Sequence, residues 1–592
     1  MNTHRNTQFL RWGTLLVTLV SAAGVAAFSQ HIQAEGWLQL SRGLQFSRWL
    51  GWGGVALLAL LSGYAWLGGA ECISQWLTGA VARLSRLHWL MLPVLVALLV
   101  VFPVLVMGHF QVYLVQNWTR HAVFMWLALL TTLVWQSLWK KVWWETLMAS
   151  ALSMAVVYHL ATYFPNVTNY PFTLWWSETS RYYLGSTFFA ERLYGKAVPW
   201  SFRDLTRYLM QAAPFLIPNS TLWLSRLWQV ILRFTMGYFT GMIFARKLKI
   251  SPGWPFWAFT AWAGLYFFQG PVFYNLIVIV MLAVWLVDEK RFWKTLLVVA
   301  GVSVYAGFSR INWVPMPGLI AAAYYFLRRS VRGRDLNSVV RYLAAPAVWV
   351  LVGVVVGLGA QNYWATNSGN PPEIYYSSFT SYLLWKRLFP NPSYAMGILP
   401  SILLVTAPLL IFLGLGVVRR WKNWHFVRIL ALVGMTAALG AGGLLVSVKI
   451  GGGTNLHNMD VYLVILLIIV LDLYFGFAVD GEGQPFRVGM HVWLKAAVVA
   501  MPVLFVVTYT GQNFLQWDRQ AAQRDLVQIQ QYVDQASAGG GEVLFITQRH
   551  LITFGYIQNV ELVHAHEKIL LQEMAMSQNE VYLDHFGAEL AA

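Results

Sequence analysis

The stretch from Trp89 to Met107 reads WLMLPVLVALLVVFPVLVM and contains no charged side chain. An α-helix needs about 20 predominantly apolar residues, or roughly 17 at the short end, to cross the hydrocarbon core of a bilayer. A run this long and this apolar is typical of a membrane-spanning helix. It therefore predicts that the chain enters the bilayer, and the remaining sequence shows how often it does so.

Similar apolar runs recur along the whole chain, and a window criterion finds about fifteen of them. They lie near 12–28, 52–69, 89–107, 122–139, 143–163, 221–244, 256–270, 272–287, 294–308, 313–327, 342–360, 399–418, 427–448, 461–478 and 491–510. Several runs between 256 and 327 are short, which leaves tilted or re-entrant segments as alternatives to full spans. The first run follows Arg5 and Arg11 and ends at Ala26-Ala27, so a cleaved signal peptide is an alternative there.

The composition agrees with this pattern and excludes a soluble globular protein. Of the 592 residues 58% are hydrophobic and only 11% are charged, and the mean hydropathy is +0.54. Soluble domains carry about a quarter charged residues. The 31 Trp and 27 Tyr residues suit side chains that lie at membrane–water interfaces. Cys72 is the single cysteine, which excludes an intramolecular disulfide and a cysteine-based zinc site.

The net charge of +17 does not indicate a nucleic-acid partner, because the basic residues form short clusters between apolar runs. The positive-inside rule places such clusters in cytoplasmic loops. With a cytoplasmic N-terminus, every second loop carries them, and only the inner loop 479–490 is nearly neutral. The clusters are Arg83 and Arg86; Lys140 and Lys141; Arg246, Lys247 and Lys249; Lys290, Arg291 and Lys294; Arg328, Arg329, Arg332 and Arg334; and Arg419, Arg420, Lys422 and Arg428.

The predicted outer face carries the long connections, namely 164–220, 361–398, a glycine-rich loop at 449–460 and a polar tail from about 512. Long loops of this kind are usually functional or disordered. These loops are rich in Trp, Tyr and Pro rather than in residues typical of disorder, so we expect ordered loops. The working face of the protein is therefore predicted to be extracytoplasmic.

The tail resembles a small soluble domain. Residues 516–537 read as an amphipathic helix that ends at Gly539-Gly540-Gly541, residues 542–547 and 560–563 read as strands, and 566–577 as a further helix. The fold class predicted is thus an all-α polytopic membrane protein, with about 13–15 transmembrane helices and a small extracytoplasmic α/β C-terminal domain. The tail histidines match no zinc-binding spacing, although Glu567 lies beside them; they are His550, His564, His566 and His585.

Acidic residues number only 24, and Glu178 stands out among those on the outer side. It follows Trp175-Trp176-Ser177 shortly after a predicted membrane exit. Aromatic neighbours lower the local dielectric and can suit a carboxylate to act as a general base. The alternative is an interfacial carboxylate paired with Arg181, one helical turn away. Glu191 and Asp204, in the same loop, are reserve candidates, and their basic and aromatic neighbours suggest short amphipathic helices.

Two outer positions carry cations where few others lie, Arg310 and Lys449, and the pair Lys386-Arg387 lies in the loop 361–398. Ionisable groups at membrane depth are functional candidates, and arginine and lysine can hold a lipid phosphate or pyrophosphate. The loop that begins at Lys449 also offers Asn455, His457, Asn458 and Asp460 as substrate-binding candidates. The alternative is a tight turn with solvated polar residues.

The order of these parts over residues 143–592 resembles the GT-C superfamily of polyprenyl-phosphate-sugar-dependent glycosyltransferases, in a form typical of bacteria. Members of this family carry a catalytic Asp or Glu in an early outer loop, and Glu178 takes that place here. The stretch Lys449 to Asn458 is similar to a late outer loop that binds the lipid phosphate. Two features depart from the family: four spans precede the matching part, and Glu178 stands alone where the family commonly has two acids.

The resemblance implies a membrane glycosyltransferase, hexosyl or pentosyl, at the extracytoplasmic face of the plasma or inner membrane. Glu178 would be the base, Arg181, Arg310, Lys449, Asn455, His457, Asn458 and Asp460 would bind substrate, and a glycan or protein would be the acceptor. Mg²⁺ or Mn²⁺ is the only cofactor suggested by the family, and a single carboxylate favours a metal-independent reaction. The parts would be extra helices at 1–142, a GT-C-like module at 143–511 and the outer domain at 512–592.

Two other function classes remain as alternatives. A transporter or flippase of lipid-linked glycans would use the same basic residues but needs a polar path across the bilayer, and few ionisable residues lie within the spans. A catalytically inactive GT-C-like scaffold would explain the missing second acid. No Walker motif occurs, which argues against an ATP-driven pump.

Overall fold

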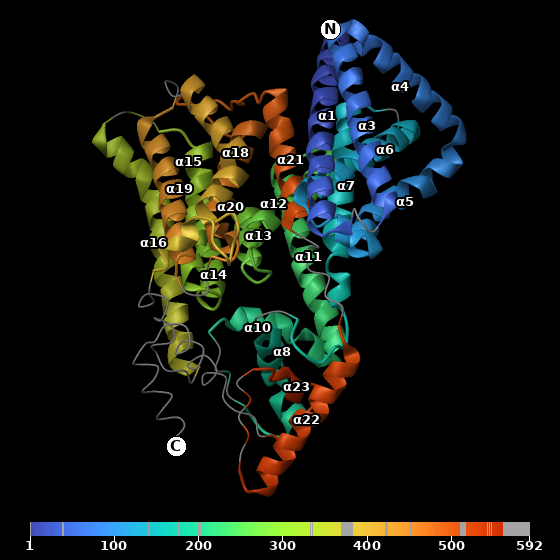
Figure 1. Cartoon of the computed structure of the whole chain (residues 1–592). Helices are drawn as coiled ribbons and strands as arrows, with labels where there is room; N and C mark the ends of the chain where they lie inside the picture. Colours follow the sequence, from blue (N-terminus) through green and yellow to red (C-terminus); the bar gives the residue numbers. More distant parts are fainter. Residues whose placement is uncertain are drawn as a thin grey trace. The chain divides into compact units, whose positions relative to one another are not determined.

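The computed structural model describes residues 2–560 except 38–40, 140, 175–177, 199, 201–202, 332, 334, 369–382, 421–423, 450–452, 510–516, 542, 544 and 546. The chain divides into two compact units (Figure 1). Unit 1 comprises residues 1–165 and 499–515, and unit 2 comprises residues 166–498 and 516–592. The boundaries at 142 and 511 expected from the sequence differ from this division, because the helix that begins at Trp143 packs with the preceding ones.

Unit 1 is built from helices throughout its described part. Its helices are α1 (Asn2–Ala34), α3 (Arg42–Tyr64), α4 (Ala70–Leu84), α5 (His88–Met107), α6 (Asn117–Trp139) and α7 (Trp143–Ala161), with the second half of α21 (Val492–Tyr509). A π-turn at Ala65–Gly69 joins α3 to α4, and Gly68 there has φ 115°, a conformation that favours glycine. Buried Arg120 of α6 donates to Leu114 O at 3.2 Å and to Val507 O at 3.1 Å, which ties α6 to α21.

Unit 2 contains a bundle of apolar helices and a group of shorter helices. The bundle comprises α11 (Leu222–Lys247), α12 (Trp254–Gln269), α13 (Ile277–Leu286), α14 (Phe292–Gly307), α15 (Met316–Arg328), α16 (Leu336–Asn367), α18 (Ile398–Arg420), α19 (Phe426–Ser447) and α20 (Asp460–Phe475). The shorter elements are α8 (Glu178–Ser186), α9 (Ala190–Tyr194), α10 (Leu205–Gln211), α22 (Arg519–Ala538) and α23 (His550–Thr553). In Figure 1, α8, α10, α22 and α23 gather at one end of this bundle.

The centre of unit 2 is α20, whose side chains are buried on nearly every side. A helix that is hydrophobic all round belongs in the middle of a bundle, and α15, α18 and α19 pack around α20. Small residues let the neighbouring helices come close. A Cβ atom on Gly318 would lie 2.7 Å from Val350 Cα, and one on Gly357 would lie 2.7 Å from Val314 Cγ1, so α15 and α16 are in backbone-level contact.

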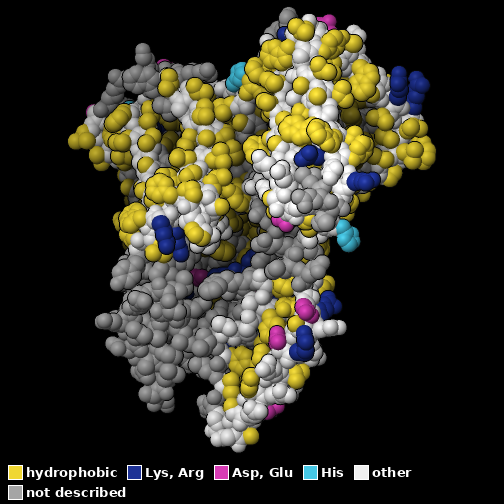
Figure 2. Space-filling view, viewed as in Figure 1, with side chains coloured by type: hydrophobic (Ala, Val, Ile, Leu, Met, Phe, Trp, Pro, Cys, Tyr) yellow, Lys and Arg dark blue, Asp and Glu magenta, His cyan; other side chains and the backbone are white. Residues whose placement is uncertain are grey.

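The surface and the helix lengths bear out the membrane class. Within the described ranges, nine helices are long and apolar enough to cross a membrane. Hydrophobic side chains cover much of the helical surface in Figure 2; Leu67, for example, is 90% exposed. The chain is therefore a multi-pass membrane protein by length and composition. The short runs predicted between 256 and 327 form α12–α15, which have 16, 10, 16 and 13 residues.

Several basic residues assigned to inner loops from the sequence are buried. Arg328 makes a bidentate pair with Asp472, with Nε–Oδ2 at 2.6 Å and Nη2–Oδ1 at 2.8 Å, and Glu289 lies 3.8 Å away. Fully buried Arg428 donates to four backbone carbonyls, including Leu327 O and Val479 O. Arg328 and Arg428 bind groups near the ends of α15 and α20. These two residues therefore contribute to helix packing as well as to the charge pattern of the loops.

The prediction of an α/β domain at the C-terminus is wrong for the described residues. The expected helix is present as α22, but Val543 and Phe545 of the predicted first strand join no sheet. They pack instead on a core made by Leu526, Val533, Leu551 and Ile557. The apolar side chains that suggested a strand therefore pack against residues of α22, of α23 and of the turn after α23. Residues 561–563 of the second predicted strand, the helix at 566–577, and His564, His566, His585 and Glu567 lie outside the described residues.

Candidate functional site

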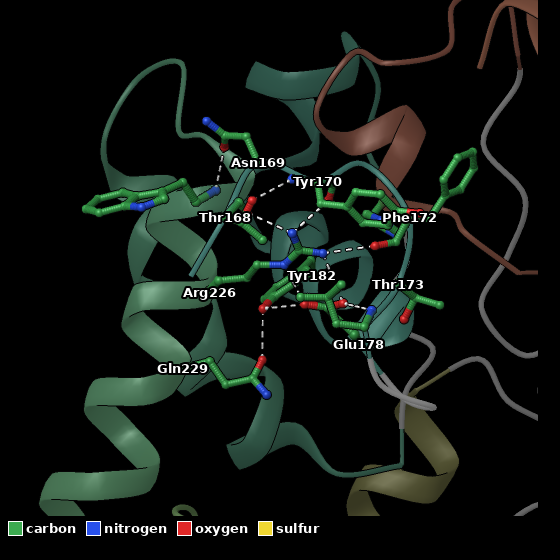
Figure 3. Close-up of polar contacts among 12 residues, drawn as sticks. Thr168, Asn169, Tyr170, Phe172, Thr173, Glu178, Tyr182, Arg226 and Gln229 are labelled. Carbon is green, nitrogen blue, oxygen red and sulfur yellow. Dashed lines mark hydrogen bonds and ion pairs between the residues drawn. The ribbon is translucent and has the colours of Figure 1, made fainter. Parts of the chain in front are cut away.

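Glu178 lies at the start of α8 and is fully buried in an ion pair (Figure 3). Its partner is Arg226 of α11, with Nε 2.8 Å from Oε1 and Nη2 3.2 Å from Oε2. Leu174 N donates to Oε2 at 2.6 Å, and Tyr182 Oη donates to Oε1 at 3.2 Å. The carboxylate is thus held by Arg226 rather than by Arg181, and both of its oxygens already accept hydrogen bonds from the protein.

Arg226 also orders the segment that precedes α8. Its guanidinium donates to the carbonyls of Thr168 and Tyr170, each at 2.7 Å, and to that of Phe172 at 3.0 Å. Arginine has five donors in a fixed planar fork, so a single side chain can satisfy a carboxylate and three carbonyls. We call Glu178 and Arg226 with these carbonyls the buried clamp.

The C-terminal part of the chain docks on the segment that the clamp orders. Buried His550 donates through Nε2 to Pro171 O at 2.6 Å, and Tyr556 Oη donates to Asn169 O at 3.1 Å. Phe554 packs edge-on against Tyr182 of α8, with ring centroids 6.0 Å apart. The described tail and the segment 166–186 therefore form one folded lobe of unit 2.

Arginines approach one another on the far side of Tyr182. Burial and, next, the Glu178 charge raise the pKa of Tyr182 well above its usual value, so its hydroxyl stays protonated and donates. Its oxygen lies 3.0 Å from the amide of Gln229, one turn along α11 from Arg226. When that amide is oriented with its nitrogen towards Tyr182, its oxygen accepts from Arg181 Nη1 at 2.6 Å and from Arg233 Nη2 at 2.9 Å. Arg181 of α8 and Arg233 of α11 thus reach the same point.

Another group forms where the loop after α14 meets the turn before α20. Arg310 Nη2 donates to Asn458 Oδ1 at 3.1 Å. Asp460 is fully buried, interacts electrostatically with Arg310 and accepts from Trp313 Nε1 at 3.1 Å. His457 is held by Asn455, whose Oδ1 lies 2.6 Å from His457 Nδ1. Five of the predicted substrate-binding residues are thereby brought together: Arg310, Asn455, His457, Asn458 and Asp460.

Helix α10 connects the two groups. Thr206 Oγ1 lies 2.6 Å from Ser309 Oγ, next to Arg310 in sequence. Arg207 interacts electrostatically with Arg181 on one side and with His457 on the other. Its guanidinium lies 5.2 Å from the ring centroid of Phe273. We call Arg181, Arg207, Arg233 and Arg310 the arginine cluster.

One carboxylate beside the arginine cluster is that of Asp204. Asp204 caps α10, lies 3.9 Å from Arg207 Nη1 and keeps 30% of its side chain exposed. Burial, together with the charges of Arg233 and Arg207, lowers the pKa of Arg181 to about 9. The charges of Arg233 and Arg207 thus disfavour the charged form of Arg181, in addition to the effect of burial.

The remaining predicted residues take other positions. Lys449 pairs through its backbone with Leu383, and its carbonyl accepts from Arg387 Nη1 at 2.8 Å, which joins the loops 361–398 and 449–460. Gly451 and Gly452 lie outside the described residues. Glu191 is exposed on α9. None of these contacts connects Lys449 or Glu191 to the arginine cluster.

The site does not suit a divalent cation. In the part of the chain that the structure describes, no three His, Cys, Asp or Glu side chains come together as a metal site would require. Glu178, the acid that the family resemblance offered as the base, is bonded to a guanidinium. We therefore derive no step that uses Mg²⁺ or Mn²⁺.

Arg207, Arg226, Arg233 and Tyr274 were not predicted as site residues. One signal in the sequence could have identified two of them: Arg226 and Arg233, seven residues apart, share a helix face with Gln229 inside an otherwise apolar predicted span. Arg207 is one of the basic neighbours of Asp204 for which the sequence suggests only a short amphipathic helix, and its interactions with Arg181 and His457 emerge from the tertiary structure. Tyr274 is 3% exposed and interacts with both Arg181 and Arg207.

Comparison of the chain with protein-family models, with curated proteins and with solved structures found no match.

Proposed function

We propose that this protein is a membrane glycosyltransferase that moves a sugar from a polyprenyl-phosphate-linked donor to an acceptor hydroxyl. The observation that carries the proposal is the arginine cluster, in which guanidiniums from α8, α10, α11 and the loop after α14 interact with one another or with the same neighbouring side chains. Guanidiniums bind phosphate oxygens through bidentate, charge-assisted hydrogen bonds. A phosphate that leaves with its electron pair needs donors of this kind.

The proposed reaction assigns a role to each group. The acceptor oxygen forms a bond with the anomeric carbon while the bond between that carbon and the phosphate oxygen breaks. The phosphate departs with the bonding electrons and is stabilised by the arginine cluster. The proton of the acceptor hydroxyl passes to a carboxylate, and the geometry favours Asp204 over Glu178 for this step.

Accessibility and bonding distinguish the two acids. Glu178 is fully buried and both of its oxygens accept hydrogen bonds within the protein. Asp204 is partly exposed, and its carboxylate lies 3.9 Å from Arg207 Nη1. A general base must come within hydrogen-bond reach of the proton that it removes. In this proposal Asp204 is the base and Glu178 belongs to the buried clamp.

The test is turnover of a panel of radiolabelled polyprenyl-phosphate sugars by the full-length protein in proteoliposomes. We expect Asp204→Asn to lower kcat by roughly a hundredfold or more, a typical contribution of general base catalysis. Asp534→Asn is the matched control, because Asp534 lies on α22 and bonds with its helix neighbour Gln530.

Two outcomes would contradict the proposal at different levels. Full activity of Asp204→Asn would remove Asp204 as the base while leaving the enzyme intact. If the wild-type protein transferred sugar from none of the donors, the proposal of an enzyme would be contradicted. The flippase and the inactive scaffold would then be the alternatives to test.

A further inference from the structure

A short turn before α18 packs at the ends of two apolar helices. This turn, Trp385–Leu388, contacts both α18 and α19. Gly397 directly precedes α18, and a Cβ atom on it would collide with the backbone of Phe389, just after the turn. The segment after α19 bonds to the same turn, with Leu384 N donating to Val448 O at 2.6 Å. The turn thus lies where α18 begins and α19 ends.

The lengths of these helices place the turn near the surface of a bilayer. Both helices are long and apolar enough to cross a membrane, and α19 has 22 residues. At a rise of about 1.5 Å per residue, α19 is about 33 Å long. The hydrocarbon core of a bilayer is about 30 Å thick, so a helix of this length ends in the headgroup region. The turn is therefore at the depth of the lipid headgroups.

Side-chain contacts fix the turn to the segment that follows α19. Arg387 Nη1 donates to Lys449 O at 2.8 Å. Gly453 has φ 86°, and a Cβ atom there would lie 2.7 Å from Arg387 Cδ, so this position requires glycine for two reasons. Arg387 is thus used to hold the turn in place, and the neighbouring side chains of the turn are presented outward.

The outward side chains include two large aromatic groups. Trp385 is 58% exposed and Phe389 is 57% exposed. Leu383, at the start of this segment, and Leu445, in the last turn of α19, are exposed as well. Aromatic side chains are enriched at the border between lipid and water, where an apolar ring enters the lipid. We call residues 383–389 the aromatic turn.

The charge around the aromatic turn is entirely positive. Residues 383–398 and 444–459 contain three cationic side chains, Lys386, Arg387 and Lys449, and no Asp or Glu. Lys386 is exposed and directly follows Trp385. Loops on the outer side of a membrane usually carry few cations. Lysine at a membrane surface attracts anionic lipid headgroups, which offers a reason for a cation in this place.

We infer that the aromatic turn anchors the protein in the adjacent lipid leaflet, with Trp385 and Phe389 inserted between headgroups and Lys386 paired with the phosphate of an anionic phospholipid. Exposed aromatic rings contribute nothing to binding a free phosphate, so the leaflet itself is the partner. The inference is independent of the proposed function, because anchoring requires neither a sugar donor nor transfer.

The first test measures the depth of the aromatic turn in the full-length protein, in nanodiscs of phosphatidylcholine and phosphatidylglycerol. Trp385→Cys in a Cys72→Ser background carries a nitrobenzoxadiazole label. Phospholipids spin-labelled near the top of the acyl chain should quench this label, and aqueous iodide should not. The control is Tyr532→Cys, whose position on polar α22 is 59% exposed, and its label should respond to iodide alone.

Quenching of the label at position 385 by iodide and not by lipid would overturn the inference and would leave a protein partner as the occupant of the aromatic turn. If Trp385→Cys fails to fold, Leu383→Cys carries the label instead, with the same expected result.

The second test uses the label at position 385 to compare headgroups. Headgroup-spin-labelled phosphatidylglycerol should be enriched about fivefold around the label relative to phosphatidylcholine, the factor expected for one lysine at the membrane surface. Lys386→Gln should remove most of this preference. Lys290→Gln is the matched control, because Lys290 is an exposed cation in another loop, and it should leave the preference unchanged. Equal quenching by the two lipids, or a preference that survives Lys386→Gln, would overturn the role of Lys386.

Discussion

The role inferred for Glu178 changes once its neighbours in the structure are known. In the sequence it is an isolated acid among aromatic residues close to a predicted membrane exit. In the structure it is the acid of the buried clamp, and Arg226 links it to the carbonyls of Thr168, Tyr170 and Phe172. Because that segment also receives His550 and Tyr556, the ion pair supports the whole lobe.

We predict that Glu178→Gln lowers stability more than it alters the chemistry. Removing one partner of a buried ion pair leaves the other charge uncompensated, which costs about 3–5 kcal/mol. The free energy of unfolding would be measured by tryptophan fluorescence, with Glu191→Gln on exposed α9 as the control. The double variant with Arg226→Gln should cost less than the sum of the single changes. A variant of wild-type stability that has lost all transfer would make Glu178 a catalytic group instead.

A second residue-scale prediction concerns Arg181. Burial and the charges of Arg233 and Arg207 lower the pKa of Arg181 to about 9, while Tyr274 and Tyr182 act in the opposite direction. A guanidinium carries its charge below its pKa and loses it above. Sulfate, whose own charge does not change in this range, should therefore bind more weakly as the pH rises through about 9.

The matched variant for this titration is Arg233→Gln. Removing a neighbouring positive charge should raise the pKa of Arg181, so the loss of sulfate binding should move to higher pH. Arg246→Gln should leave the transition where it is. Sulfate affinity that is independent of pH, or a transition unaffected by Arg233→Gln, would show that Arg181 stays charged throughout.

Among the elements, helices α14, α15 and α16 depend on glycines for their spacing. A Cβ atom on Gly307 of α14 would collide with the carbonyl oxygen of Gly357 on α16, whereas one on Gly301 of the same helix would meet nothing within 4 Å. Without water between helices, close van der Waals contact is a main source of helix association in a bilayer. The glycine positions therefore determine how near α16 can come.

The pair Gly307→Ala and Gly301→Ala tests this spacing with the same chemical change. Gly307→Ala should destabilise unit 2 by about 1–3 kcal/mol, the usual cost of overpacking. Gly301→Ala should have little effect on stability. Thermal unfolding of the detergent-solubilised protein would measure both, and equal melting temperatures would mean that α14 and α16 do not touch as described.

The C-terminal tail shows that a pattern of apolar residues does not by itself establish a strand. The apolar residues around Val543 and Phe545 predict a strand, but a strand needs a partner for its backbone. In the described residues these two side chains are instead half-buried against a core made by α22 together with Leu551 and Ile557. The amphipathic pattern of α22 is longer and more regular, and the prediction of that helix is confirmed. The spacing of apolar residues predicts which side chains are buried, but it does not predict the residues against which they pack.

For the whole molecule, the orientation in the membrane remains a prediction of the charge pattern. It places Cys72, the single cysteine, on the cytoplasmic side and α22 on the outer side. Because Cys72 is exposed, it can report on its own location. A membrane-impermeant maleimide should leave Cys72 unlabelled in intact cells and label it after permeabilisation.

The complementary probe is Ser537→Cys on α22 in a Cys72→Ser background. This variant should react with the maleimide in intact cells. Labelling of Cys72 without permeabilisation, together with protection of the thiol introduced on α22, would invert the predicted topology and would move the arginine cluster to the cytoplasmic face.

The sequence alone determined that the chain is a membrane protein. It also determined where most apolar helices lie and where α22 lies, because hydrophobic length and periodicity are local properties of a chain. Five candidates, Arg310 and the residues from Asn455 to Asp460 named above, are also close in the structure. Only the tertiary structure identified the partners of Glu178 and placed Arg207 and Arg233 in the arginine cluster. It also showed that the described part of the tail contains no sheet. Arg226 lies 48 residues from Glu178 along the chain, and Asn458 lies 148 residues from Arg310. Such pairings follow from the packing of distant helices, which no local pattern of residue types encodes.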